Sequence, residues 1–190
     1  MAAVISNIHA KLAPDIREEE FKIPVDEYYN YDPSVKNEID YLRNAYEKYT
    51  SGFATTKVRS RSENMLERWC ENREDIEWVY KNGDSGQTYL SIVYITGAGK
   101  QRLFYPDYIV RKQDGTIWLL EAKGGEDADG NTQNIDTQSE NKFNALREYA
   151  GKHNLNWGFV RNYDGQLFVN NTEWHEEMGD EHWISIEGSL

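Results

Sequence analysis

Residues 104–123, FYPDYIVRKQDGTIWLLEAK, contain the stretch that decides the fold. Two runs rich in β-branched and aromatic residues flank the turn sequence QDG at 113–115. Such runs on either side of a short glycine-containing turn predict an antiparallel β-hairpin.

The turn fixes which residues face each other. A three-residue loop closed by a left-handed glycine pairs Lys112 with Thr116, and this register places Asp107 opposite Glu121. A two-residue Asp-Gly loop would place the two carboxylates on opposite faces of the sheet. We favour the first register.

The second strand of the hairpin is apolar on both faces. Side chains alternate between the two faces of a strand. One face therefore carries Ile117, Leu119, Glu121 and Lys123, and the other carries Trp118, Leu120 and Ala122. A strand that is apolar on both faces is typical of the centre of a sheet covered on both sides.

Helical and strand periodicities alternate along the chain. Helices are predicted at 34–52, 60–72 and 135–154. Strands are predicted at 76–81, 88–95, 100–110, 116–123, 157–163 and 166–171, the last two joined by an Asp-Gly turn, and residues 124–132 are predicted to form a polar loop. Residues 96–100, TGAGK, form a turn, because they lack the remaining positions of a phosphate-binding loop.

This order predicts an α/β fold with a mixed central sheet flanked by helices. We divide the chain into an N-terminal arm and helix at 1–55, which could belong to a preceding domain, and one domain at 56–190.

Composition limits the classes of function. A single cysteine fits a reducing compartment, and no apolar run approaches the roughly 18 residues of a membrane helix, so a cytoplasmic protein without membrane contact is expected. The net charge of −12 argues against indiscriminate nucleic-acid binding. The charge is uneven, because residues 51–125 hold 11 basic and 10 acidic side chains, whereas residues 126–190 hold 4 and 13.

The predicted pairing of Asp107 with Glu121 calls for a cation. Two adjacent carboxylates repel each other unless one is protonated or a cation lies between them. Oxygen ligands with room for water suit Mg²⁺, and Lys123 nearby can stabilise charge on a phosphate. The alternative is an ordinary cross-strand ion pair with Lys123.

The sequence Pro106-Asp107, followed across the hairpin by Glu121-Ala122-Lys123, resembles the PD-(D/E)xK nuclease superfamily. It is similar to the endonuclease domain that closes the restriction subunit of type III restriction enzymes and related DEAD/DEAH-type helicases, over roughly residues 60–149. The resemblance implies a restriction-endonuclease-like αβββαβ core.

The resemblance also implies roles for individual residues. Asp107, Glu121 and the carbonyl of Ala122 would hold Mg²⁺, with Mn²⁺ as a substitute, and Lys123 would orient or activate the attacking water. The implied substrate is DNA, and the implied partner is a helicase or ATPase motor. The alternative is a catalytically inactive nuclease-like module that binds DNA or serves as a protein scaffold.

The family carries a further acidic residue on the helix before the sheet. We favour Glu63 as the residue that matches this position, where it would be a further metal ligand, and Glu67 is the rival. Alternatively, Glu63 could serve only in a capping box with Ser60 at the start of the helix. On the later helix, Gln138 and Lys142 lie one turn apart, so both could reach a phosphate or water, or simply face solvent.

Overall fold

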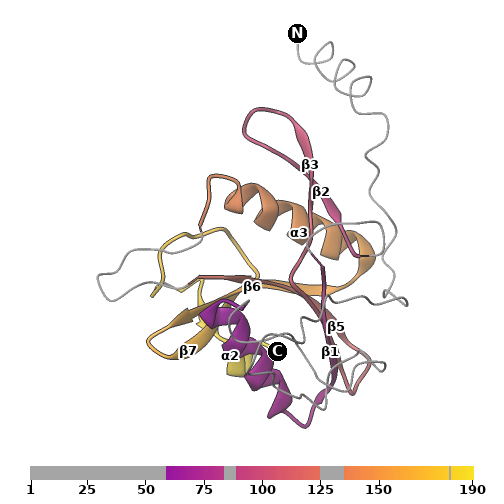
Figure 1. Cartoon of the computed structure of the whole chain (residues 1–190), viewed down its shortest axis with the longest axis vertical. Helices are drawn as coiled ribbons and strands as arrows, with labels where there is room; N and C mark the ends of the chain where they lie inside the picture. Colours follow the sequence, from indigo (N-terminus) through magenta and orange to yellow (C-terminus); the bar gives the residue numbers. More distant parts are fainter. Residues whose placement is uncertain (1–58, 84–88, 125–134, 180) are drawn as a thin grey trace, which may run out of the picture.

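The computed structural model describes residues 59–83, 89–124, 135–179 and 181–190 (Figure 1). The predicted arm and helix within 1–55, the predicted boundary at 55/56 and most of the predicted loop at 124–132 lie outside these residues. The helical elements are α2 (Arg61–Glu71), α3 (Ser139–His153) and the 3₁₀ helix η1 (Ile186–Gly188). The strands are β1 (Ile76–Lys81), β2 (Ile92–Ile95), β3 (Gln101–Phe104), β4 (Tyr108–Lys112), β5 (Ile117–Lys123), β6 (Asn156–Tyr163), β7 (Gln166–Asn170) and β8 (Ile184–Ser185).

Six strands form one sheet in the order β1-β4-β5-β6-β7-β8, and β2 and β3 pair separately. Strand β5 runs parallel to β6, and every other neighbouring pair is antiparallel. The predicted α/β fold with a mixed central sheet is therefore confirmed. With the β2–β3 hairpin taken as an insertion, the order α2, β1, β4, β5, α3, β6 is helix, three strands, helix, strand.

The two helices cover opposite faces of the sheet (Figure 1). The Tyr108 hydroxyl donates to Glu67 of α2 at 2.6 Å. On the other face, Phe143 of α3 packs edge-on against Phe159, with ring centroids 5.2 Å apart. Since Phe159 pairs with Glu121 across β5 and β6, Glu121 lies on the α3 face.

The predicted register of the central hairpin is confirmed. Tyr108 pairs with Leu120, the Lys112 N–H donates to the Thr116 carbonyl at 2.9 Å, and Gly115 has a φ of 86°. A left-handed glycine at this position is what a three-residue loop requires. Asp107, one residue before β4, therefore lies opposite Glu121.

The prediction of one continuous strand at 100–110 is wrong. Strand β3 ends at Phe104 and β4 begins at Tyr108, and β3 belongs to the separate two-stranded sheet. Pro106 has no N–H to donate to a strand ladder. Its carbonyl accepts a hydrogen bond from the Asn82 side chain at 2.9 Å. The chain turns there from one sheet into the other.

Two element boundaries also differ from the prediction. Helix α3 begins at Ser139 rather than at 135, because the Asp136 carboxylate accepts the Gln138 N–H at 2.8 Å and forms a turn before the helix. Strand β2 begins at Ile92, and the predicted start at 88 lies outside the described residues. No helix among the described residues is long and apolar enough to cross a membrane.

Candidate active site

Asp107 and Lys123 both lie in contact with Glu121. The Asp107 N–H donates to Glu121 Oε2 at 3.3 Å, and Lys123 Nζ is 2.7 Å from Glu121 Oε1. The Ala122 N–H donates to Asp107 Oδ2 at 2.9 Å. Their side chains are 19%, 7% and 11% exposed, so the group is mostly buried but open to solvent at Asp107.

The sheet explains why these residues meet. Antiparallel pairing brings the beginning of β4 beside the end of β5, which is where Asp107 and Glu121 stand. The end of β5 is held on its other side by β6, where the buried Arg161 pairs with Lys123 and donates from Nε to the Gly124 carbonyl at 2.8 Å. The backbone that carries Glu121 and Lys123 is thus fixed from both neighbouring strands.

The pair of carboxylates does not ionise evenly. Burial, followed by the negative charge of Asp107, raises the pKa of Glu121 to about 8. Burial also opposes ionisation of Asp107, but the Lys81 ammonium outweighs it and holds the pKa of Asp107 below its usual value. Burial would lower the pKa of Lys123, yet the Glu121 carboxylate raises it above the ordinary value.

Lys81 belongs to the same group and was not among the residues predicted from sequence. Its Nζ lies 2.7 Å from Asp107 Oδ1 and 3.0 Å from Glu63 Oε1, and its side chain is 5% exposed. It also lies over the Tyr108 ring at 4.7 Å. The sequence does show a lysine at the end of a predicted strand, but a 26-residue separation hides its pairing with Asp107.

Glu63 reaches the group through Lys81. Its second oxygen accepts the Ser60 N–H at 2.7 Å, while the Ser60 hydroxyl accepts the Glu63 N–H at 3.2 Å, so the capping box is present as well. Both of its oxygens are engaged, and Lys81 stands between Glu63 and Asp107. The structure therefore brings Glu63 to the edge of the group rather than beside the other two carboxylates.

Glu67, the rival candidate, lies inside the protein with Arg59. Arg59 Nε donates to its Oε1 at 2.8 Å, and each side chain of this pair is 2% exposed. Burial raises the pKa of Glu67 although Arg59 and the Tyr108 hydroxyl oppose the shift. The charge of Arg59 is therefore used inside the protein.

Gln138 and Lys142 lie around the beginning of α3, beside the site. Lys142 Nζ is 3.0 Å from Asp136 Oδ2, and Asp136 in turn acts electrostatically on Lys123. The Gln138 side-chain oxygen accepts the Gly97 N–H at 3.4 Å, which joins the start of α3 to the β2–β3 turn. Lys142 is thus tied to the neighbourhood of Lys123, and Gln138 faces the hairpin.

No family model, curated protein or solved structure matches this chain.

The donors fit a hard divalent cation. Asp107 and Glu121 supply adjacent carboxylates, and the Ala122 carbonyl follows Glu121 on β5. Mg²⁺ commonly uses one or two carboxylates and keeps several waters. Within the described ranges no three His, Cys, Asp or Glu side chains cluster around a common point, so main-chain oxygen and water would complete the shell. The raised pKa of Glu121 means that its charged form is disfavoured in this environment, and such an ion would stabilise that form.

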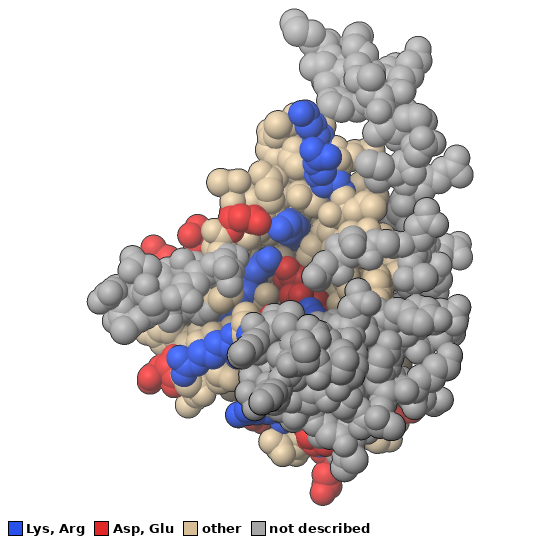
Figure 2. All heavy atoms as spheres, in the orientation of Figure 1, with Lys and Arg blue, Asp and Glu red and all other residues tan. Residues whose placement is uncertain are grey.

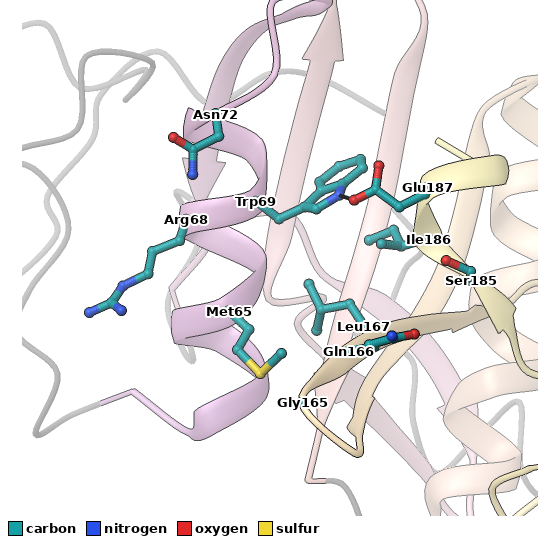
Figure 3. A pocket seen from close by; sticks show the side chains of 10 residues that line it. All are labelled: Met65, Arg68, Trp69, Asn72, Gly165, Gln166, Leu167, Ser185, Ile186 and Glu187. Carbon is teal, nitrogen blue, oxygen red and sulfur yellow. Dashed lines mark hydrogen bonds between the residues drawn. The ribbon is translucent and has the colours of Figure 1, made fainter.

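A hollow of about 460 Å³ lies elsewhere, between α2, the β6–β7 turn and η1 (Figure 3). Trp69 forms one side of it, with its indole N–H donating to Glu187 at 2.6 Å. The remaining lining residues are Met65, Arg68, Asn72, Gly165, Gln166, Leu167, Ser185 and Ile186. None of the predicted site residues lines it, and it offers no pair of acidic side chains.

Proposed function

We propose that this protein is a metal-dependent DNA nuclease of the PD-(D/E)xK type. The supporting observation is the contact of Asp107, Glu121 and Lys123 at the adjoining ends of two paired strands. The αβββαβ order of the core and the motif resemblance agree with this proposal. The reaction is hydrolysis of a phosphodiester bond in DNA.

Asp107, Glu121 and the carbonyl of Ala122 would hold Mg²⁺ or Mn²⁺. A bound ion of this kind supplies Lewis acidity, drawing charge from a phosphoryl oxygen. Glu121 also fixes the Lys123 ammonium at 2.7 Å. Because the pKa of Lys123 is raised, it acts as a cation, orienting a water and stabilising negative charge that develops on the phosphate.

Lys81 and Glu63 act as positioning residues in this proposal. Lys81 holds one oxygen of Asp107, and the Ala122 N–H holds the other. Glu63 holds Lys81 from the side of α2. Together these contacts restrict the rotation of the Asp107 carboxylate, which is what a precisely placed ligand needs.

The acidity of the chain bears on how it meets DNA. With a net charge of −12, the protein should bind a duplex weakly and with strong dependence on salt. We infer that a helicase or ATPase motor, in the same or another chain, holds the substrate at the site, as in type III restriction systems. Tethering can supply an effective concentration on the order of millimolar without any new contact.

One observation favours a second candidate, a nuclease-like scaffold without catalysis. Lys81 already neutralises Asp107 with a built-in ammonium, so the pair has a partner without a metal ion. If Lys81 cannot yield to a divalent cation, the protein serves as a DNA-binding or protein-binding module.

Nicking of supercoiled plasmid at low salt separates the two candidates. The wild-type chain should convert plasmid to the nicked form with Mg²⁺ or Mn²⁺ and not with EDTA. Asp107→Asn and Lys123→Ala should be inactive while melting cooperatively. Asp114→Asn, an exposed position on the same hairpin, is the matched control and should cut like wild type. Absence of nicking by wild type with either ion would favour the scaffold, and nicking by Lys123→Ala at the wild-type rate would contradict the role proposed for Lys123.

A further inference from the structure

The β2–β3 hairpin stands apart from the main sheet and beside the candidate active site. It forms its own two-stranded sheet and projects from the body of the molecule (Figure 1). The Asn82 side chain ties its two ends together, donating to the carbonyls of Leu90 at 2.8 Å and Pro106 at 2.9 Å. Asn82 directly follows Lys81, and its N–H donates to the Asp107 carbonyl at 2.8 Å. The hairpin is therefore built on the backbone that carries the site.

The turn at the far end of the hairpin also contacts the body of the protein. The Thr96–Gly99 turn is closed by the Gly99 N–H on the Thr96 carbonyl at 2.8 Å, and Gly97 contacts Gln138 at the start of α3. Asp136, in the turn before α3, acts on Lys123. The base of the hairpin thus adjoins Asp107, and its turn contacts the start of α3.

The charge of the hairpin is opposite to that of the whole chain. Asp and Glu make up 33 of the 190 residues, yet residues 89–106 contain neither. The same stretch contains Lys100 and Arg102, both exposed, and neither forms an ion pair with another described residue. Figure 2 shows basic side chains on this projecting part with no acidic side chain among them.

Three other basic side chains between residues 51 and 125 are already paired with carboxylates. Arg59 is buried against Glu67, Arg111 lies 2.9 Å from Glu77, and Lys112 lies 3.1 Å from Asp75. The hairpin therefore presents basic charge that the described part of the protein does not itself neutralise.

One face of the hairpin is apolar and turned to solvent. Ile92 pairs with Phe104 at the base, and both are buried. Toward the opposite face, Ile95 is 50% exposed and Leu103 is 42% exposed. A two-stranded ribbon has the width that the major groove of B-DNA admits, and apolar side chains there can contact thymine methyl groups.

We propose that the β2–β3 hairpin is a DNA-binding wing that lies in the major groove of a duplex next to the cleavage site. Ile95 and Leu103, which share one face of the ribbon, face the base edges. The register places Lys100 and Arg102 on the other face, and their long side chains reach past the ribbon edges to the phosphates that flank the groove. This inference rests on the proposed function, since it names the element that engages the nuclease's substrate.

The test is fluorescence anisotropy of a labelled duplex with the whole chain in EDTA, so that binding is measured without cleavage. Each phosphate contact contributes about 0.9 to the slope of log affinity against log salt, so Lys100→Ala/Arg102→Ala should lower the slope by about 1.8. A fourfold rise in salt should then cost the wild type about tenfold more affinity than the variant. The matched control is Arg68→Ala/Arg147→Ala, which removes the same charge from exposed positions on α2 and α3 and should keep the wild-type slope.

Two further variants separate the possible outcomes. Asp107→Asn should bind the duplex with the wild-type salt dependence and fail to cut it. Loss of cleavage and loss of binding by the wing can then be told apart. If the wild type nicks plasmid but the hairpin and control variants share one slope, the wing is refuted while the nuclease stands. If Ile95→Ser/Leu103→Ser lowers the oligomeric mass in sedimentation and leaves DNA affinity unchanged, the face joins copies of the protein and the proposal is overturned.

Discussion

Glu121 should dominate the pH dependence of stability in the metal-free protein. Burial and the charge of Asp107 raise its pKa from 4.5 to about 8 on folding. A carboxyl group with a raised pKa holds its proton more tightly in the folded state, so its stabilising contribution is complete below pH 4.5 and is lost as pH rises through about 8. Each pH unit inside that window removes on the order of 1 kcal/mol, or about 3 kcal/mol between pH 5 and pH 8.

Glu121→Gln removes the titrating group and keeps nearly the same volume. We expect the free energy of unfolding of wild type, measured by urea denaturation in EDTA, to fall relative to that of Glu121→Gln across this window. Comparing the two proteins at each pH cancels the other ionisable groups. Glu140→Gln, at an exposed position on α3, should follow the wild type. Parallel curves for wild type and Glu121→Gln from pH 5 to pH 8 would refute the reasoning.

Lys81→Met should destabilise the protein by about 3–5 kcal/mol in urea denaturation, because it leaves the partly buried carboxylates of Glu63 and Asp107 without their shared cation. Millimolar Mg²⁺ should raise the melting temperature of this variant more than that of wild type, and an equal rise in both would contradict a shared cation position. Gly115→Ala should lower the free energy of unfolding by about 1–2 kcal/mol in the same assay, since φ is 86° there and a Cβ disfavours that conformation. Gly97→Ala should lower it less, because a Cβ at that position meets no other atom within 4 Å.

The hairpin at 104–123 was predictable because its information is local. The QDG turn fixes the register, the register places Asp107 opposite Glu121, and alternation along β5 puts Lys123 on the same face. None of these steps depends on a distant part of the chain.

Lys81 and Arg59 were not predictable for the opposite reason. The pairing of β1 with β4 joins strands separated by the β2–β3 insertion, so nothing in the local pattern sets Lys81 beside Asp107. Arg59 precedes α2 and looks like a surface cation until Glu67 is seen to be buried beside it. Proline lacks the N–H that a strand ladder needs, so Pro106 indicates a break in the strand. The apolar residues on both sides of it nevertheless favoured one continuous strand.

The central claim is that Asp107 and Glu121 share a divalent cation. Crystals of the chain grown with Mn²⁺ and measured at the manganese absorption edge test it most directly. We expect an anomalous difference peak in contact with both carboxylates and the Ala122 carbonyl, and its loss in Asp107→Asn. A map with no peak there and with Lys81 Nζ still bound to Asp107 would contradict it.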